Sequence, residues 1–417
     1  MPPKALQGLR VLEFAEFVSG PYCAKLMADL GAEVIKIEPP DLGDESRRRG
    51  PFPNDLPDQD ASGLFLYLNT GKLGVTLDPS KLTGRRIFEK LVAQADILIE
   101  NNPVGVMSKL GLGFDSLKTI NPKLIMASIT PFGQSGPYAH WKSYYLNTFH
   151  AGGEGYTLPG GIGWQMYPER PPLKAGGFIG EYNCGVAAAT AIVGAAFGCL
   201  MCEAGQYIEI SEQEVLASLM RTDLGKYNDG WVESRATRSV PIGGFIHCKD
   251  GFVQLIPLWK HMWTALVAAM GNPEWAGEAR FQHERLMAGW QGVTRVSDDI
   301  LRDREEANER IEQWAMQYNS EEIYTVVQRH GCIAAPVCSV ADLFSSKQLQ
   351  AREFIPEVEH PEAGCLKYLG APYKFSETPW RIDKPAPLLG RHNEEVYCNR
   401  LGYSRQELVQ MRRAGII

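Results

Sequence analysis

The sequence lacks several features that would place it in a specialised class. Its 417 residues include 9 cysteines without regular spacing, and this odd number argues against a disulfide framework. The histidines and cysteines do not form a set with the spacing of metal ligands, so no metal site is predicted. A P-loop, a GxGxxG turn and a GxSxG elbow are also missing. The sequence therefore gives no motif for nucleotide-triphosphate binding, for nicotinamide binding or for a serine hydrolase.

Positive charge is scarce. Lys and Arg number 42 against 49 Asp and Glu, which gives a formal net charge of -7 and a pI near 5.7. The one basic cluster, Arg47-Arg48-Arg49, has acidic neighbours, and we interpret it as a solvated loop. Without a basic stripe, neither nucleic acid nor an anionic membrane surface is expected as a partner.

Long apolar runs are also rare. The first residues, Met1 to Phe14, do not have the pattern of a signal peptide, and with the free cysteines they predict a cytoplasmic protein. The run Val186–Cys202 is short of the roughly 20 residues of a membrane span and is rich in Ala and Gly. It predicts a helix buried between the layers of a folded domain, not a membrane segment.

The N-terminal part alternates between two periodicities. Short apolar runs predict strands, and helical patterns lie between several of them. The expected strands are Arg10–Phe14, Glu33–Ile37, Leu73–Leu77, Ile97–Ile99, Leu124–Ile129 and Tyr207–Ile210, and the expected helices are Pro21–Leu30, Thr83–Ala93 and Glu212–Leu219. Apolar strands joined by helices indicate an α/β domain with a doubly wound parallel sheet, covered on both faces.

A chain of this length predicts two domains of unequal size. A hairpin is expected at Gly244–Cys248 and Phe252–Ile256, around the turn Lys249-Asp250-Gly251. We therefore expect a large α/β domain over 1–225, a smaller α+β domain over 226–330, and a return to the large domain over 331–417, including Ala334–Val340. The Gly-rich stretch Ala151–Trp164 is expected to be an ordered loop at a functional surface.

Several short blocks, in one order along nearly the whole chain, resemble family III coenzyme A transferases. The first group is Gly8–Glu13, Gly20-Pro21, Gly31–Glu38, Gly43-Asp44 and Arg48. The second is Asn69, Lys72, Leu77-Asp78, Glu100-Asn101, Gly105, Lys109, Gly111, Asn121-Pro122, Ser128, Phe132-Gly133-Gln134 and Gly136-Pro137. The last is Pro385–His392, Glu395-Val396, Leu401–Tyr403 and Gly415-Ile416. The resemblance implies a doubly wound large domain, a smaller domain and an interlocked dimer.

The resemblance also implies an activity, which is the transfer of coenzyme A (CoA) from an acyl-CoA donor to a carboxylic acid through an acidic nucleophile. The family has an Asp just ahead of an apolar helix, and Glu181 occupies that place here, in Gly180–Gly185. The extra methylene moves the carboxylate by roughly 1 Å, which can cost about a hundredfold in rate. The alternative interpretation of Glu181 is an acid at a helix N-terminus that interacts with the helix dipole.

The matched blocks imply further site residues. The residues implied for coenzyme A or acyl-CoA, which is a substrate and not a tightly bound cofactor, are Val18, Ser19, Lys72, Leu77, Asp78, Asn101, Asn102, Lys109, Thr130 and Phe132. The residues implied for the acyl group are Gln134, His150, Gly152 and Gly153, with backbone N–H groups of the Gly-rich loop as oxyanion donors. The aromatic residues Tyr144, Tyr145, Phe149, Tyr156 and Trp164 indicate either a roomy acyl pocket or plain core packing.

Two alternatives remain open. Pro39, Leu73 and Thr130 stand where relatives often have Arg or Lys, so the chain is alternatively a non-catalytic CoA-binding subunit of a heteromer, as in benzylsuccinate-type transferases. A racemase or isomerase acting on acyl-CoA is the third hypothesis, with His150 as its base. The racemase His aligns nearer Ser143, however, which favours a packed or substrate-facing His150.

Overall fold

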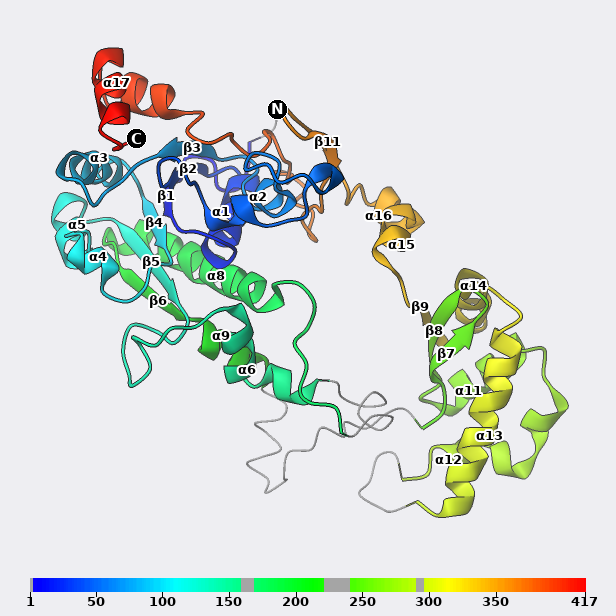
Figure 1. Cartoon of the computed structure of the whole chain (residues 1–417). Helices are drawn as coiled ribbons and strands as arrows, with labels where there is room; N and C mark the ends of the chain where they lie inside the picture. Colours follow the sequence, from blue (N-terminus) through cyan, green and yellow to red (C-terminus); the bar gives the residue numbers. More distant parts are fainter. Residues whose placement is uncertain (1–2, 159–168, 221–240, 290–295) are drawn as a thin grey trace. The chain divides into compact units, whose positions relative to one another are not determined.

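The computed structural model of the 417-residue chain describes residues 3–158, 169–220, 241–289 and 296–417 (Figure 1). The chain divides into two compact units. The first comprises 1–158, 171–233 and 351–417, and the second comprises 159–170 and 234–350. The predicted boundary at 225/226 lies outside the described residues.

The first unit is built on a six-stranded parallel sheet, as the sequence predicts. Its order is β3-β2-β1-β4-β5-β6, and every neighbouring pair is parallel. The strands are β1 (Arg10–Phe14), β2 (Glu33–Glu38), β3 (Leu73–Thr76), β4 (Ile97–Glu100), β5 (Ile125–Thr130) and β6 (Tyr207–Ser211). All six lie within one residue of the predicted ranges, because each is a short apolar run between turn residues.

Helices cover both faces of this sheet (Figure 1). Val11 of β1 packs in a core with α1 (Ser19–Asp29) and α8 (Ile179–Cys202), while its neighbour Leu12 packs on the opposite face. The opposite face is covered by α3 (Leu82–Val92), α4 (Val106–Lys109), α5 (Phe114–Ile120), a π-helix (η6, Glu394–Arg400) and α17 (Arg405–Arg413). Alternate side chains of a strand point to opposite faces, so both faces need apolar residues.

The strand order reverses between β1 and β4. The chain runs outward through β2 and β3 on one side, and through β5 and β6 on the other. In open α/β sheets the carboxyl ends of the strands at such a switch point are the usual place for a ligand. The segments that follow Phe14 of β1 and Glu100 of β4 therefore frame the expected site.

A network of buried charges lies beside this switch point. Lys36 Nζ is 2.8 Å from Glu13 Oε1 and 2.7 Å from Asp44 Oδ2, and all three side chains are fully buried. Burial opposes the charge, but Asp44 and Glu13 raise the pKa of Lys36. Arg47 is also fully buried and pairs with Glu38 at 2.6 Å, so the interpretation of the arginine cluster as a solvated loop is wrong at this residue. A local charge pattern does not reveal partners that come from other strands.

The C-terminal segment covers the edge of the sheet at β3. His392 N donates to Gly74 O at 2.9 Å, and Gly74 N donates to His392 Nδ1 at 3.0 Å. The Asn393 side chain accepts from Thr76 N and donates to Thr76 Oγ1, and the Tyr397 hydroxyl donates to Thr76 O. This part of the first unit also contains the hairpin of β10 (Glu357–His360) and β11 (Gly364–Lys367) and, from the N-terminal half, α2 (Gly63–Leu68).

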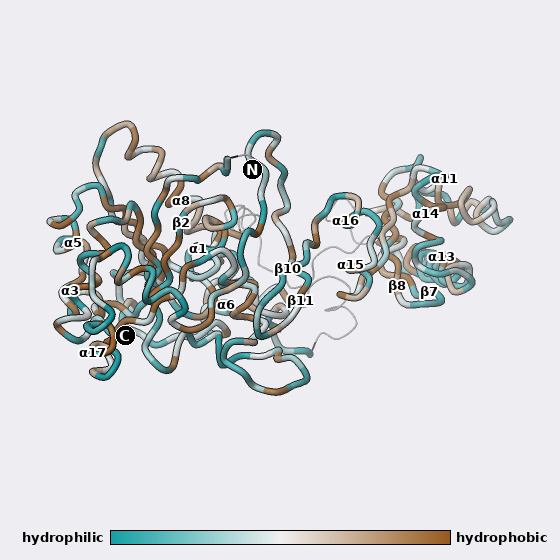
Figure 2. Tube along the Cα trace, turned by 90° about the horizontal axis from the view of Figure 1, so that it is seen from above, coloured by the Kyte–Doolittle hydropathy of each residue, from teal (hydrophilic) through white to brown (hydrophobic). Residues whose placement is uncertain are grey.

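The second unit has its own core. The predicted hairpin is present as β7 (Gly244–Cys248) and β8 (Gly251–Ile256), and β9 (Ile333–Pro336) pairs with β8. The expectation that Ala334–Val340 returns to the large domain is therefore wrong for this strand. The helices are α11 (Lys260–Ala269), α12 (His283–Leu286), α13 (Asp298–Ala315), α14 (Ser320–His330), α15 (Val340–Ser345) and α16 (Lys347–Ala351). Figure 2 shows α13 as largely hydrophilic, which fits a helix with one buried stripe.

Helix α8 differs from its prediction. It packs on α1 through residues such as Ala188 and Ile192, but Phe197 is 69% exposed and Leu200 is 79% exposed. By length and composition alone, α8 would be long and apolar enough to cross a membrane, although core helices satisfy the same criterion. The expectation of a helix buried between layers is therefore wrong for its C-terminal half, whose apolar surface the described residues do not cover.

Candidate active site

Glu181 lies in the first turn of α8 and is 5% exposed. Burial raises the pKa of its carboxyl, a hydrogen bond from its own backbone N–H lowers it, and so does the positive charge of Lys174. The net effect is a raised pKa. A carboxylate in this position is stabilised by the N-terminal end of the helix dipole but is poorly hydrated, which is the condition of a reactive nucleophile.

Glycines allow four elements to meet at this helix end. A side chain at Gly152 would lie 2.3 Å from the Cβ of Leu216, so α6 (Tyr145–Ala151) ends directly against α9 (Glu212–Leu219). A side chain at Gly185 would lie 2.9 Å from the carbonyl oxygen of Ser19, which brings α8 against the start of α1. Gly180 similarly contacts Leu216. The ends of α1, α6, α8 and α9 therefore meet around Glu181, and we call this meeting point the enclosure.

A second carboxyl group, that of Glu212, lies in this enclosure. It is the first residue of α9, and its side chain is hydrogen-bonded to the hydroxyls of Ser19 and Thr148. Burial and the negative charge of Glu181 raise its pKa, the two hydroxyls lower it, and the result is a pKa of about 7. Cys184 Sγ contacts the Glu212 carbonyl oxygen at 3.9 Å.

Aromatic rings border the site on one side. The ring centroid of Phe17 lies 5.5 Å from that of Tyr144 and 4.9 Å from that of Phe178. The centroids of Tyr145 and Phe178 are 5.0 Å apart. Tyr182 packs edge-on against Tyr22 at 4.7 Å. Because these rings pack against one another, the described part favours packing over a roomy aromatic pocket. Trp164, in the predicted pocket set, lies outside the described residues.

Lys174 is the cation that acts on Glu181. Its Nζ donates to Ala175 O at 2.7 Å and to Gly177 O, and it lies 5.2 Å from the ring centroid of Tyr145. Its charge lowers the pKa of Glu181. Backbone carbonyls and a ring face therefore hold this ammonium, and no described residue forms an ion pair with it.

The predicted CoA residues Val18, Ser19, Asn101 and Asn102 lie at the switch point. Asn101 Oδ1 accepts from Glu16 N at 2.9 Å, and its Nδ2 donates to Glu16 O at 2.7 Å. Asn102 Nδ2 donates to Phe14 O at 3.3 Å. Val18 is fully buried, and Ser19 binds Glu212. The two asparagines thus hold the loop after β1 in place, a role that matched blocks alone do not reveal.

The two lysines predicted for phosphate contacts differ. Lys72 is 1% exposed, and its Nζ lies 2.7 Å from Glu13 Oε2 and donates to Pro21 O and Asn69 Oδ1. Burial lowers the pKa of Lys72 to about 8 in spite of Glu13. With all three of its donors engaged, Lys72 does not reach a solvent-borne phosphate in this structure. Lys109, at the end of α4, is exposed beside the carboxyl end of β4.

The other predicted CoA residues lie at strand ends. Leu77 is buried after β3, and Asp78 Oδ1 accepts from Ser80. Thr130 ends β5, and its buried Oγ1 has no hydrogen-bond partner among the described residues. Phe132 follows it and packs on Tyr138 at 6.2 Å.

The residues predicted for the acyl group are only partly brought together. Gly152 is buried against α9, whereas His150 is exposed and lies over Gly155. The N–H groups of Gly152 and Gly153 donate to Thr148 O and His150 O, so they are not free for an oxyanion in this conformation. Gln134 is tied to β6, since its N–H donates to Glu209 at 2.5 Å.

The Gly-rich stretch is more regular than predicted. Its beginning belongs to α6, and 154–157 form a 3-10 helix (η3, Glu154–Thr157). Residues 159–168, which contain the rest of the predicted loop, lie outside the described part. The expected ordered loop thus contains one short 3-10 helix in its described part.

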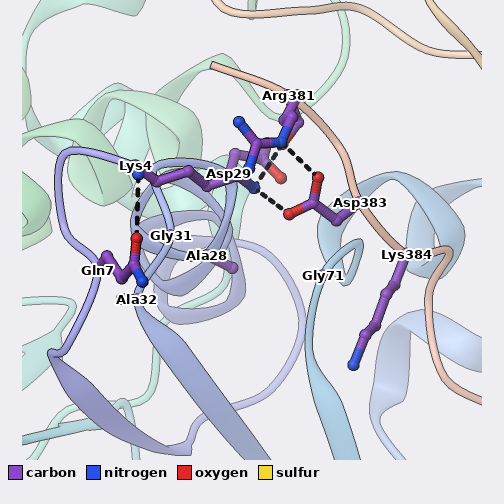
Figure 3. A pocket seen from close by; sticks show the side chains of 10 residues that line it. All are labelled: Lys4, Gln7, Ala28, Asp29, Gly31, Ala32, Gly71, Arg381, Asp383 and Lys384. Atoms are coloured by element: carbon purple, nitrogen blue, oxygen red, sulfur yellow. Dashed lines mark hydrogen bonds and ion pairs between the residues drawn. The ribbon is translucent and has the colours of Figure 1, made fainter. Parts of the chain in front are cut away.

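A separate cavity of about 280 Å³ lies at the other end of α1 (Figure 3). Lys4 there lies 2.8 Å from Asp383, and Arg381 also binds Asp383 at 2.8 Å. Asp29 is paired with Lys25 at 2.7 Å. The carboxylates that line this cavity are therefore neutralised by Lys and Arg. Asp29 is at the C-terminal end of α1, whereas Ser19, near Glu181, is at its N-terminal end. This cavity is therefore distinct from the Glu181 site.

The residues that sequence reasoning missed are Glu212 and Lys174. Glu212 follows the predicted strand Tyr207–Ile210 and reads as an ordinary helix-start acid, and Lys174 lies in a loop without a pattern. The fold reveals both residues, because α8 and α9 pack side by side and bring Glu212 near Glu181, and because the charge of Lys174 acts on Glu181. Cys199 and Cys202, which are spaced as CxxC, also escaped notice. They lie on the last turn of α8 as free thiols, and the described residues contain no cluster of three or more potential metal ligands.

Comparison with known proteins decides the family. The model of "CoA-transferase family III" matches residues 6–393, which is most of the chain. The chain belongs to the family III CoA-transferases. It is therefore an enzyme that transfers coenzyme A, as the resemblance implied.

Two curated family III relatives match over their full length. The formyl-CoA:oxalate CoA-transferase of Streptomyces coelicolor is 29% identical and covers 100% of both chains. The succinyl-CoA–D-citramalate CoA-transferase of Chloroflexus aurantiacus is 28% identical and covers 100% of this chain and 99% of its own. Among solved structures, a CAIB/BAIF family protein from Brucella suis superimposes with a TM-score of 0.80, at 27% identity and 95% coverage of this chain.

Proposed function

We propose that the enzyme moves CoA from an acyl-CoA donor to a carboxylic acid acceptor through a covalent intermediate on Glu181. The observation that carries this proposal is the position of the carboxylate, which is buried at the start of α8 inside an enclosure formed by four helix ends. Partial desolvation makes an anion more reactive, and the helix start keeps it ionised.

The chemistry balances without an oxidant or a metal. A carboxylate oxygen of Glu181 attacks the thioester carbonyl carbon, the C–S bond breaks, and the thiolate leaves with the electron pair. The thiolate then attacks the Glu181 carbonyl carbon of the mixed anhydride, which releases the donor acid as a carboxylate and leaves a Glu181 thioester. The acceptor carboxylate then attacks the carbonyl carbon of the Glu181 thioester and releases the thiolate. The thiolate attacks the acceptor's carbonyl carbon in the new mixed anhydride, which forms the product thioester and frees the Glu181 carboxylate. No net proton is consumed.

The switch point supports a place for coenzyme A. The loop after β1, held by Asn101 and Asn102, leads directly into Ser19 at the enclosure. Exposed Lys109 follows β4 at the same edge of the sheet and is the cation that we assign to a phosphate of the coenzyme. Lys72 is left out of this assignment because its donors are engaged.

We infer that the acceptor is a small acid with a second anionic group. Lys174 is held beside Glu181 and can pair with an acceptor carboxylate. The names of relatives include oxalate, citramalate and glutarate transferases, and these proteins are 28–29% identical to this chain. The mutual packing of the aromatic rings disfavours a bulky aromatic acid.

We also propose that two copies assemble through the outer face of α8. Val193, Phe197, Leu200 and Met201 leave an apolar surface on this helix that the described residues do not cover. The N-terminal end of α8, which contains Glu181, is packed in the first unit, so the whole helix is not available to cross a membrane. This supports a protein partner for the apolar face rather than lipid.

Steady-state turnover tests this function. The purified chain is assayed with formyl-CoA, succinyl-CoA and benzoyl-CoA as donors and with oxalate, succinate, glutarate and benzoate as acceptors. Glu181→Gln is expected to lose at least a thousandfold in kcat, whereas Glu214→Gln, an exposed acid on α9, keeps the native rate. Full activity of Glu181→Gln would overturn the nucleophile. A chain that binds CoA thioesters but turns over only with a second, related protein would instead support the non-catalytic subunit.

A further inference from the structure

Two carboxyl groups share one enclosure at the ends of α8 and α9, but only one of them has a cation beside it. Lys174 acts on Glu181. Glu212 has no Lys or Arg ion pair in the described ranges, and its partners are the hydroxyls of Ser19 and Thr148. Both residues are buried, at 4% and 1% exposure. Glu212 is therefore held by neutral groups next to an anion.

Like charges in one poorly hydrated site cannot both ionise easily. Glu181 is the third residue of α8, whereas Glu212 is the first residue of α9. Glu181 also accepts from its own N–H and has the positive charge of Lys174 acting on it, so it is the one that keeps the negative charge. Burial and the charge of Glu181 leave Glu212 with a pKa of about 7. Below about pH 7 Glu212 therefore holds a proton next to the ionised Glu181, and titration of the two groups is coupled.

We propose that Glu212 is a positioning residue of this active site: in its protonated form it leaves Glu181 as the sole anion of the enclosure and fixes Ser19 and Thr148 beside it. This role rests on the proposed function of Glu181. A second negative charge there would repel the acceptor carboxylate and the departing thiolate, both of which are anions. Ionisation of Glu212 thus closes the site to its substrates electrostatically, without changing the fold.

The titratable groups of the described elements around α9 come from several segments. They are Glu181, Tyr182, Cys184, Cys199 and Cys202 of α8, Tyr145 and His150 of α6, Glu154 and Tyr156 of η3, Tyr207 and Glu209 of β6, Tyr22 in the first turn of α1, Glu169, Arg170 and Lys174 of the loop before α8, and Glu214 of α9 itself. Burial raises the pKa of the Cys184 thiol, so it stays neutral. Among these groups, only Glu181 contributes a charge that shifts the pKa of Glu212.

The test compares the native enzyme with Glu212→Gln and with Glu214→Gln. The Gln side chain keeps the hydrogen-bonding shape of Glu212 but cannot ionise. The value of kcat/KM for the native enzyme is expected to fall about tenfold per pH unit above pH 7, because Glu212 loses its proton there. Glu212→Gln is expected to remove this alkaline fall, and Glu214→Gln should retain the native profile. The same alkaline fall in Glu212→Gln would overturn the proposal.

A second measurement does not depend on turnover. Because the folded state binds the Glu212 proton more tightly than the unfolded state, native stability falls as pH rises from about 4.5 to about 7. Glu212→Gln avoids this loss, so its thermal midpoint should exceed the native one by several degrees at pH 8 and differ little at pH 5. Equal midpoints at pH 8 would overturn the protonated state of Glu212. If the native chain does not turn over while this shift is observed, the proposed function fails and the proton on Glu212 stands.

Discussion

The Asp44 carboxylate accepts a hydrogen bond from the backbone N–H of Phe17 at 3.0 Å. Phe17 has a positive φ of 69°, which is unusual for a bulky residue, and it belongs to the loop that leads to Ser19. Asp44 is in turn paired with the buried Lys36. The buried charge network thus fixes the backbone of the site loop.

Removal of the central cation of this network should unfold or loosen the first unit. Lys36→Met leaves Glu13 and Asp44 as buried anions without this partner, and the expected loss of unfolding free energy is about 3–5 kcal/mol. Guanidinium unfolding followed by circular dichroism measures it. The matched control is Lys123→Met, which breaks an exposed pair with Glu203 and should change stability by less than about 1 kcal/mol. Equal effects of the two substitutions would show that the network does not stabilise the unit.

The strands of the first unit could be predicted because their information is local. Each run such as Arg10–Phe14 or Glu33–Ile37 is apolar, short and bounded by turn residues, so hydrophobic pattern and length suffice. Glu181 was also placed correctly at the start of an apolar helix.

What the sequence could not predict depends on residues that are far apart along the chain. Lys72 looks like a free cation until Glu13, from another strand, is seen 2.7 Å away. The outer face of α8 resembles a core surface in sequence because the helix is apolar on all sides. The local sequence therefore does not show which side of the helix other residues cover. Glu212 reads as a helix-start acid until α8 places a second carboxyl beside it.

Protonation of His392 should weaken the cover over β3. Burial lowers the pKa of His392, and its Nδ1 accepts a hydrogen bond from Gly74 N, which only the neutral ring allows. The folded state thus binds this proton less tightly than the unfolded state does. The contribution of His392 is fully present above about pH 6.5 and is lost as pH falls below that value.

Thermal unfolding of His392→Gln between pH 5 and pH 8 checks this. The variant should show a smaller loss of midpoint on acidification than the native chain, because an amide does not titrate. His140→Gln, at an exposed position of the same unit, should follow the native curve. A native slope in His392→Gln would assign the acid sensitivity to other groups.

Lys109 is expected to bind a phosphate of the coenzyme. Lys109→Ala should weaken binding of a CoA thioester about fivefold, because an exposed charged hydrogen bond is worth about 1 kcal/mol. Calorimetric titration at low and high salt measures this, and the difference between the proteins should shrink at high salt. Lys260→Ala, at an exposed lysine of the second unit, is the control. Unchanged affinity in Lys109→Ala would remove this residue from the coenzyme site.

The apolar face of α8 is expected to be an interface between two copies. Leu200→Glu places a charge on this face and should shift the protein from dimer to monomer, as measured by light scattering after size exclusion. Leu82→Glu, at a residue that is 65% exposed on α3, should stay dimeric. A native protein that is monomeric at micromolar concentration would contradict the interface.

The most direct test of the account is chemical trapping of the intermediate. The native chain is incubated with an acyl-CoA, quenched with hydroxylamine or borohydride, and digested for mass spectrometry of the peptide that contains Glu181. The account predicts a hydroxamate or a reduced side chain at Glu181, and no modification at Glu212 or Glu214. An unmodified Glu181 in a chain that turns over would contradict it.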